Sequence, residues 1–350
     1  LVTASMLGES GKDVLVLEAR DQVGGLASAS EFAPGFKCND IYDVVKWIDP
    51  RVIRQLNLKS HGLELHSPDL VRIALDTQGQ HIGFHRDPNE TAGSIANHSE
   101  KDAKVWKAFT EYIDKLTYFI EKLYELTPPK LPNIGLKEAF SLRSILSPIR
   151  KHGTRGLVDF MRVAPMMMPE LVDEWFENEL LRAAISTAGI HHLSFGPFAA
   201  ATGLNLLHQH VHSEGVFHNA NFVKGGTGEL ANAVKLSAES VNVAIQTNSK
   251  VSAINVENGV CTGVTLESGE TIQADQIVSG LDPRNTFINL VGQSKLNPTF
   301  ATQLRNIKYR GSTARIHFSL NALPDIKGVT EDQMGTVFSA SPSIEYLERT

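Results

Sequence analysis

The sequence predicts an α/β protein, of mixed α+β character, in which two domains interleave along the chain. Three observations carry this prediction. Residues 1–18 read as helix, turn and strand, residues 97–190 are largely helical, and residues 225–278 read as another helix followed by strands. Helix–strand units on either side of a helical insertion are typical of an α/β domain that holds a second domain between its parts.

Composition excludes several classes of protein. The 350 residues are 42% hydrophobic and 21% charged, which is ordinary for a globular chain and excludes a wholly disordered one. A net charge of -6 argues against a nucleic-acid partner. Cys38 and Cys261 form neither a disulfide scaffold nor a C-x-x-C redox pair. No apolar run reaches the ~18 residues of a membrane span, which leaves peripheral contact with a membrane open.

Glu18 ends the first strand. Residues 1–11 read as a helix capped by Gly11, and VLVLE at 14–18 reads as a buried strand that stops on this acid. Helix, strand and terminal acid in this order form the second half of a βαβ dinucleotide-binding unit, in which the acid binds the adenosine ribose. The alternative is a solvated acid at a strand end. We expect the first strand and a G-x-G-x-x-G loop to precede Leu1.

A glycine pair, Gly24 and Gly25, follows this acid closely. Because glycine has no Cβ, the pair would let the chain pass close to a pyrophosphate and its attached ring system. Arg20 lies between the acid and the glycines. It is either a ligand of the adenosine part or a surface charge.

The middle of the chain predicts strands and then helices. Residues 62–86 alternate as a β-hairpin, and residues 97–126 carry apolar side chains at helical spacing. Proline and glycine break the pattern at 128–135. Helices then resume as far as residue 190, including one helix over 170–189.

Three glycines, Gly225, Gly226 and Gly228, form a loop that runs into a helix from about Glu229. The loop either offers backbone N–H groups at a helix N-terminus to an anion or an electron-rich ring edge, or is a plain turn. A four-stranded meander and one last strand are expected after it. These strands are Ala244–Thr247, Val251–Glu257, Cys261–Leu266, Thr271–Gln273 and Gln276–Val278, the last ending on Ser279-Gly280.

Histidines cluster before that loop, at His191 and His192 and at His208, His210 and His212. A helical i, i+4 pair would need a third ligand to hold a metal, and the sequence points to none, so we expect no metal site. The histidines could instead transfer protons beside a cofactor, or have a surface or structural role. The chain shows no serine elbow and no Ser/His/Asp pattern, so its catalytic residues stay unassigned.

The order of these parts resembles one family. The strand ending VLEARDQVGG, the helical insertion, GGTGEL, the meander and ADQIVSGLDP are similar to the FAD-dependent phytoene desaturase/carotenoid–retinoid oxidoreductase group. APGFK, WFENELLRAAIST and LLHQHVH make the likeness closest to the subgroup of pyridine nucleotide-disulfide oxidoreductase domain-containing protein 2 and its bacterial relatives, as a fragment lacking both ends. Thiol–disulfide chemistry is not implied, because it needs paired redox cysteines.

The resemblance implies a Rossmann-like FAD-binding domain interleaved with a substrate domain of mixed sheet and helices. The expected FAD-binding parts are 1–61 and 225–285, and the expected substrate-domain parts are 62–224 and 286–350. Leu26 departs from the family, where arginine is common after the glycine pair. The cofactor-binding residues carried over are Glu18 for the adenosine ribose, Gly24 and Gly25 for the pyrophosphate and flavin, Gly225, Gly226 and Gly228 for the flavin ring or substrate mouth, Val251 for adenine through its backbone, and Ser279 and Gly280 along the cofactor.

The implied function is hydride transfer between FAD and an apolar, isoprenoid- or retinoid-like substrate, with NAD(P) as a further electron donor or acceptor. Two alternatives stay open. One is a non-catalytic FAD-fold protein that acts through protein partners. The other is a flavin amine oxidase, which needs an aromatic cage and is disfavoured by only six tyrosines. The compartment would be the cytoplasm for a bacterial chain and an organellar matrix for a eukaryotic one.

Overall fold

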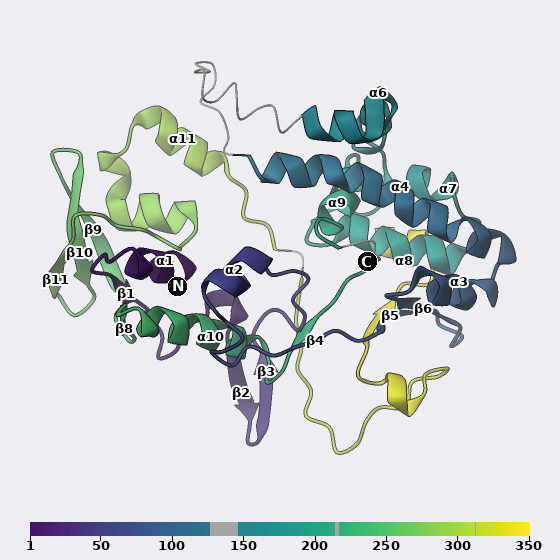
Figure 1. The fold of residues 1–350 in the computed structure, drawn as a ribbon, viewed down its shortest axis with the longest axis horizontal. Helices are drawn as coiled ribbons and strands as arrows, with labels where there is room; N and C mark the ends of the chain where they lie inside the picture. The colour runs from purple at the N-terminus through teal and green to yellow at the C-terminus, as the bar shows by residue number, and fades with distance from the viewer. Residues whose placement is uncertain (127–145, 214–216, 312) are drawn as a thin grey trace. The chain divides into compact units, whose positions relative to one another are not determined.

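The structure is a computed structural model that describes residues 1–126, 146–213, 217–311 and 313–350. The expected breaker at 128–135 lies outside these residues. The chain forms two compact units, each made from two stretches of sequence (Figure 1). Unit 1 comprises Leu1–Leu65 and Phe222–Arg310, and unit 2 comprises His66–Asn221 and Gly311–Thr350. Helices and both parallel and antiparallel strands occur, which confirms the α/β class of mixed character.

The division differs from the expected boundaries chiefly at the last one. Residues 286–310 belong to unit 1, whereas the sequence had suggested a return to the substrate domain at 286. The physical reason is the helical turn Arg284–Gly292, which packs against β9 (Val251–Glu257) of the same unit. α11 (Pro298–Asn306) in turn packs against that helical turn.

A parallel pair of strands lies at the centre of unit 1. β1 (Leu15–Leu17) pairs with β8 (Ala244–Gln246), and each strand is preceded by a helix. Those helices, α1 (Val2–Glu9) and α10 (Thr227–Ser240), pack against each other. Two helix–strand units joined through parallel strands are the arrangement expected of a Rossmann-like domain.

β8 therefore does not belong to the meander, contrary to the sequence-based expectation. The meander has three strands, β9, β10 (Val260–Leu266) and β11 (Thr271–Gln273), in the order β11-β10-β9. β8 pairs with β1 instead, because hydrophobic Val14, Val16 and Ile245 pack there against a small buried cluster of unit 1. The expected strand at 276–278 is also wrong, since these residues form no strand and Val278 is 68% exposed.

A hairpin and a short helix complete unit 1. β2 (Ala29–Ala33) and β3 (Phe36–Asn39) pair around the Pro34-Gly35 turn. α2 (Pro50–Gln55) begins at Asp49, whose side chain accepts a hydrogen bond from the Arg51 N–H. β4 (Leu65–His66) pairs with β7 (Phe222–Val223) in a further two-stranded ladder.

Unit 2 holds a three-stranded sheet covered by helices. β5 (Leu70–Leu75) and β6 (His81–His85) form the expected hairpin, and β12 (Val337–Ala340) adds to β5 in parallel. Trp106, Phe109, Phe84 and Phe217 are among the aromatic side chains at the centre of its core. The helices of the unit are α3 (Pro88–Ala96), α4 (Glu100–Tyr124), α6 (Leu146–Val163), α7 (Met168–Asp173), α8 (Glu179–Ile190), α9 (Thr202–Gln209) and α12 (Ile344–Arg349).

The single helix expected over 170–189 is in fact two helices, α7 and α8. Asp102 explains the break, because its buried carboxylate accepts hydrogen bonds from the backbone N–H groups of Glu177 and Asn178. The side chain of Asn178 then caps α8 by accepting from the Leu181 N–H at 2.9 Å. A partner 75 residues away in sequence therefore ends one helix and lets the next begin.

Candidate functional site

Glu18 directly follows β1 and is half-buried. Its backbone is held on both sides, because its N–H donates to the Gln246 carbonyl at 2.9 Å and its carbonyl accepts from the Ser249 N–H at 2.8 Å. The side chain bends back so that Oε1 accepts from the Arg20 N–H at 2.9 Å. Among the residues the structure describes, the second oxygen, Oε2, makes no hydrogen bond. A fixed acceptor is thus left facing solvent.

Arg20 shapes the loop that follows. Its guanidinium donates to the Gly25 carbonyl at 2.9 Å and to Ser28 Oγ at 3.1 Å, and lies 3.6 Å from an oxygen of Asp40. Asp40 also accepts from Ser28 Oγ and from Ser30 Oγ. Arg20 is an exposed residue whose side chain also has partners within the loop, and its contact with a cofactor stays a prediction. It ties the glycine turn to the end of β3.

The two glycines of the pair have different surroundings. Gly24 has φ +134° and lies so close to α10 that a Cβ would stand 3.1 Å from that of Ala231. Gly25 has φ +57°, and a Cβ there would meet nothing within 4 Å. Gly24 thus serves the packing of the loop on α10, whereas Gly25 leaves open space beside the loop.

The glycine loop before α10 closes on the β2–β3 hairpin. Gly226 has φ +96°, and a Cβ there would lie 2.6 Å from Asn39 Oδ1. That oxygen accepts a hydrogen bond from the Thr227 N–H at 2.8 Å and so caps the helix. Gly228 lies against Ala29, where a Cβ would stand 3.2 Å away, and Gly225 against the Glu229 side chain at 2.9 Å. The protein itself therefore provides the acceptor for the first N–H of α10, for which the sequence had suggested an anion as one alternative.

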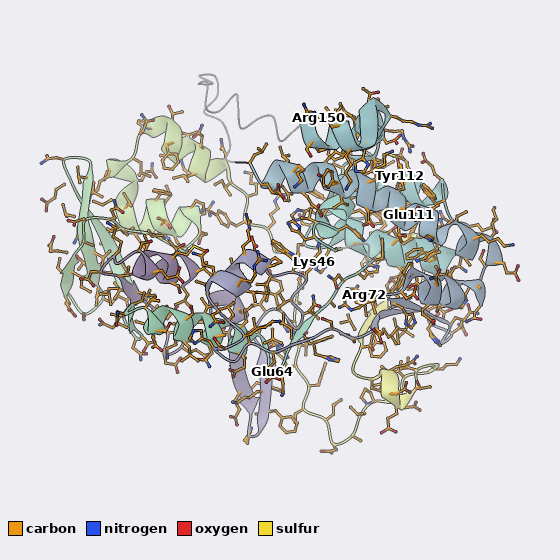
Figure 2. The ribbon with its side chains drawn as sticks, viewed as in Figure 1. Lys46, Glu64, Arg72, Glu111, Tyr112 and Arg150 are labelled. Carbon is orange, nitrogen blue, oxygen red and sulfur yellow. The ribbon has the colours of Figure 1, made fainter. Side chains whose placement is uncertain are left out.

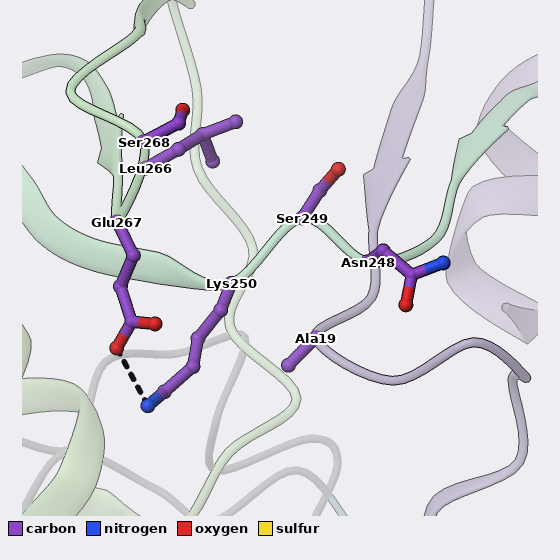
Figure 3. A pocket seen from close by; sticks show the side chains of 7 residues that line it. All are labelled: Ala19, Asn248, Ser249, Lys250, Leu266, Glu267 and Ser268. Atoms are coloured by element: carbon purple, nitrogen blue, oxygen red, sulfur yellow. Dashed lines mark ion pairs between the residues drawn. The ribbon is translucent and has the colours of Figure 1, made fainter.

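A pocket of about 220 Å³ is lined in part by Ala19, the residue that follows Glu18 (Figure 3). On one wall Lys250 and Glu267 form an ion pair at 2.6 Å. Asn248 is bound to the Glu18 loop, because its N–H donates to the Arg20 carbonyl at 2.8 Å. The pocket is lined by Ala19, Asn248, Ser249, Lys250, Leu266, Glu267 and Ser268.

Val251 directly follows this pocket-lining segment and begins β9 opposite Leu266. The structure thus brings Glu18, Arg20, Gly24, Gly25 and Val251 into one loop system. The glycines before α10 join it through Ala231 and through the hairpin. Of the two remaining predicted residues, Ser279 bonds Thr286 through their hydroxyls at 2.7 Å, and Gly280 has open space beside it, since a Cβ there would meet nothing within 4 Å. Their part in the site stays a prediction.

The residues present fit the adenosine end of a dinucleotide cofactor. An exposed carboxylate oxygen stands ready for ribose hydroxyls, and the adjoining pocket has a polar rim and an apolar side at Leu266. Gly25 leaves the loop free of side-chain bulk where a pyrophosphate would pass.

Sequence reasoning missed Ser28, Asn39 and Asp40. Asn39 acts on a residue 188 positions further along, and Ser28 and Asp40 are 12 positions apart. No local pattern marks such partners. An Asn-Asp pair at the end of a short strand was the one available signal.

The histidines lie in unit 2 and take structural partners. His208 Nδ1 is 2.8 Å from the Tyr124 hydroxyl, the His212 N–H donates to Glu121 at 2.8 Å, and His210 Nδ1 is 2.8 Å from the Leu206 carbonyl. Over the described ranges, no group of three or more His, Cys, Asp or Glu side chains is placed to hold a metal ion. None of the helices in those same ranges has both the length and the hydropathy to cross a membrane.

Comparison with known proteins gives three findings. The family model described as flavin containing amine oxidoreductase matches residues 1–322. Pyridine nucleotide-disulfide oxidoreductase domain-containing protein 2 of Rattus norvegicus is 28% identical over 342 residues, which cover 93% of this chain and 59% of that protein. Phytoene desaturase (lycopene-forming) of Pantoea ananas is 24% identical over 337 residues, 92% of this chain and 61% of that protein.

Among solved structures, a Pyrococcus furiosus protein has a similar fold, with a TM-score of 0.54 at 15% identity over 88% of this chain and 62% of that one. The chain therefore spans about three fifths of the length of the proteins it matches.

Proposed function

Because the chain belongs to the family of flavin-containing amine oxidoreductases, whose model matches residues 1–322, we propose that it binds FAD through unit 1 and oxidises or reduces an apolar, isoprenoid- or retinoid-like substrate. The single observation that carries the proposal is the position of the Glu18 carboxylate. Its Oε2 faces solvent at the end of a parallel strand beside a pocket, where this fold places the ribose acceptor. The similarity to phytoene desaturase supports an apolar substrate.

FAD would supply hydride transfer at its flavin ring. The residues of this chain bind and orient it. Glu18 accepts hydrogen bonds from the ribose, Val251 meets adenine through its backbone, and Gly25 leaves room for the pyrophosphate. Arg20 acts indirectly, by holding the Gly25 carbonyl and Ser28 in place. NAD(P) as the electron donor or acceptor completes the proposal.

The test is FAD affinity after Glu18→Ala in the full-length protein. Loss of a hydrogen-bonded charged acceptor costs about 1–3 kcal/mol, which weakens binding by roughly five- to hundredfold. Glu31→Ala is the matched control, since Glu31 is an exposed acid of the same unit whose carboxylate accepts only from the Gly35 N–H in the hairpin. An FAD dissociation constant that Glu18→Ala leaves unchanged would remove the basis of the proposal.

Amine oxidation is the second candidate, because the description of the family names amines. Hydrogen peroxide released on addition of a primary amine, and not on addition of an isoprenoid alcohol, would favour it. The reverse result would favour the first candidate.

A further inference from the structure

An arginine that has no partner among the described residues lies on the core face of the sheet in unit 2. Arg72 on β5 is directly opposite Phe84 on β6 and Val337 on β12. Residues opposite each other in a ladder share one face of the sheet, so Arg72 points to the side where Phe84 packs into the aromatic core. Figure 2 labels Arg72 at this strand.

The guanidinium of Arg72 has no counter-charge. It is half-buried, its Nε is shielded from solvent, and it makes no hydrogen bond or ion pair with any residue that the structure describes. Burial lowers the pKa of Arg72, but an arginine side chain keeps its charge at neutral pH. A partly shielded charge with no described partner is costly, and buried polar groups in folded proteins normally have one.

The described neighbours of Arg72 add donors and aromatic surface, and none of those named below is an acid. His218 packs edge-on against Phe84, with ring centroids 5.0 Å apart, and against Phe217 at 4.3 Å. Its pKa is well below the usual value, first through burial and then through the charge of Arg72, so His218 is neutral. Ser339 on β12 lies opposite Ala74, two residues along β5 from Arg72, and its buried hydroxyl has no partner among the described residues.

We propose that Arg72, with the Ser339 hydroxyl two residues further along the neighbouring strand, binds the carboxylate of an amphipathic substrate whose apolar body is isoprenoid. This inference rests on the proposed function, because it assigns a charged end to the apolar substrate named there. One guanidinium matches one carboxylate in charge and in its two-pronged geometry. A doubly charged phosphate would leave a negative charge uncompensated among Phe84, Phe217 and a neutral histidine.

The test compares farnesoate with farnesol, which share one isoprenoid chain and differ in the charge of the end group. Binding is measured by calorimetry on the full-length protein, without turnover. Wild type should prefer the acid by about tenfold or more, since a hydrogen-bonded charge pair accounts for that ratio. Arg72→Met should abolish the preference and leave the farnesol affinity within about twofold. Arg155→Met on α6 is the matched control, because Arg155 is exposed in the same unit.

Two further measurements complete the test, the unfolding temperature of Arg72→Met and the farnesoate affinity of a second variant. Arg72→Met should unfold at or above the wild-type temperature, because it removes an uncompensated charge. Arg72→Lys keeps the charge but loses the two-pronged geometry of the guanidinium, so it should weaken farnesoate binding by about fivefold or more. This measurement also tests the proposal if Arg72→Met does not fold.

The outcomes separate the two proposals. Equal affinity of wild type for acid and alcohol, a preference that survives Arg72→Met, or farnesoate affinity unchanged in Arg72→Lys would each overturn the carboxylate site. Absence of bound FAD from the absorbance spectrum would instead overturn the proposed function, since farnesoate binding is measured independently of flavin.

Discussion

At the scale of single residues, side chains of the loop after β1 divide binding and positioning between them. Glu18 keeps one carboxylate oxygen exposed while the other accepts from the Arg20 N–H. The guanidinium of Arg20 donates hydrogen bonds to Gly25 and Ser28 and pairs with Asp40. The acid that we propose as the ribose acceptor thus accepts a hydrogen bond from the backbone of a residue whose side chain holds the following loop.

Replacing Arg20 tests this positioning. Arg20→Met removes two hydrogen bonds made by a charged group, so we expect the FAD affinity to fall by about three- to thirtyfold without loss of folding. A lysine at this position would reach only one of the partners, so the FAD affinity of Arg20→Lys should lie between those of the wild type and Arg20→Met. Fluorescence titration with FAD measures it, and equal affinities of all three proteins would show that the loop keeps its shape without Arg20.

Asp114 on α4 predicts a pH dependence of stability. Burial, followed by the charges of Glu121 and Glu111, raises the pKa of Asp114 from 3.8 to about 6 (Glu111 is labelled in Figure 2). The folded state holds the proton of Asp114 more tightly than the unfolded state does. Protonated Asp114 therefore contributes to the free energy of unfolding at low pH, and this contribution is lost as pH rises from about 4 to about 6. Asp114→Asn should therefore stabilise the protein by about 1 kcal/mol at pH 7, allowing for solvent screening of its exposed part.

Unfolding in denaturant at pH 4 and pH 7 measures this effect. The variant and wild type should be nearly equal at pH 4 and diverge by pH 7. A gain that is the same at both pH values would contradict a titration of Asp114.

At the scale of elements, the contact between the glycine turn and α10 sets the geometry of unit 1. Gly24 lies against Ala231 of α10, and Asn39 at the end of β3 caps the same helix. A loop, a hairpin and a helix N-terminus thus meet at one place. The Asn39 side chain and the packing of Gly24 on Ala231 connect them.

The two glycines offer a matched pair for this contact. Gly24→Ala introduces a Cβ at φ +134° and 3.1 Å from Ala231, so we expect a loss of about 2–3 kcal/mol in the free energy of unfolding. Gly25→Ala places a Cβ at φ +57° in open space, where only the left-handed backbone costs about 1 kcal/mol. Chemical denaturation of both variants measures the difference, and equal losses would show that the packing on α10 contributes nothing.

At the scale of the whole molecule, each unit has its own core. The aromatic core around Trp106 and Phe109 belongs to unit 2, whereas Leu56, Leu58 and Leu63 form part of a separate core in unit 1. Compact units with separate cores can unfold separately.

We therefore expect two unfolding transitions that respond to different substitutions. Phe109→Ala should cost about 3–5 kcal/mol and lower the transition of unit 2, whereas Leu58→Ala should cost about 2–5 kcal/mol and lower that of unit 1, together with FAD release. Calorimetry in the presence of FAD separates the two. A single transition that both substitutions lower equally would mean that the units unfold as one.

The sequence by itself determined the class of the fold and most of its regular elements. Helix and strand periodicities are local, so α1, β1, the β5–β6 hairpin and α4 could be predicted from neighbouring residues alone. The acid after a buried strand and the glycines behind it likewise pointed to Glu18, Gly24 and Gly25. These patterns also carried the resemblance to flavin-dependent oxidoreductases.

Only the tertiary structure decided which of these parts meet. β8 leaves the expected meander for β1, Asp102 divides the expected helix over 170–189, and Asn39 takes the N–H of Thr227. The same holds for Arg20, whose side chain bonds Gly25 and Ser28, and for Arg72, which has no partner among the residues that the structure describes. Each outcome depends on a hydrogen bond, a strand pairing or a missing counter-charge between residues distant in sequence, and local periodicity holds no information about such contacts.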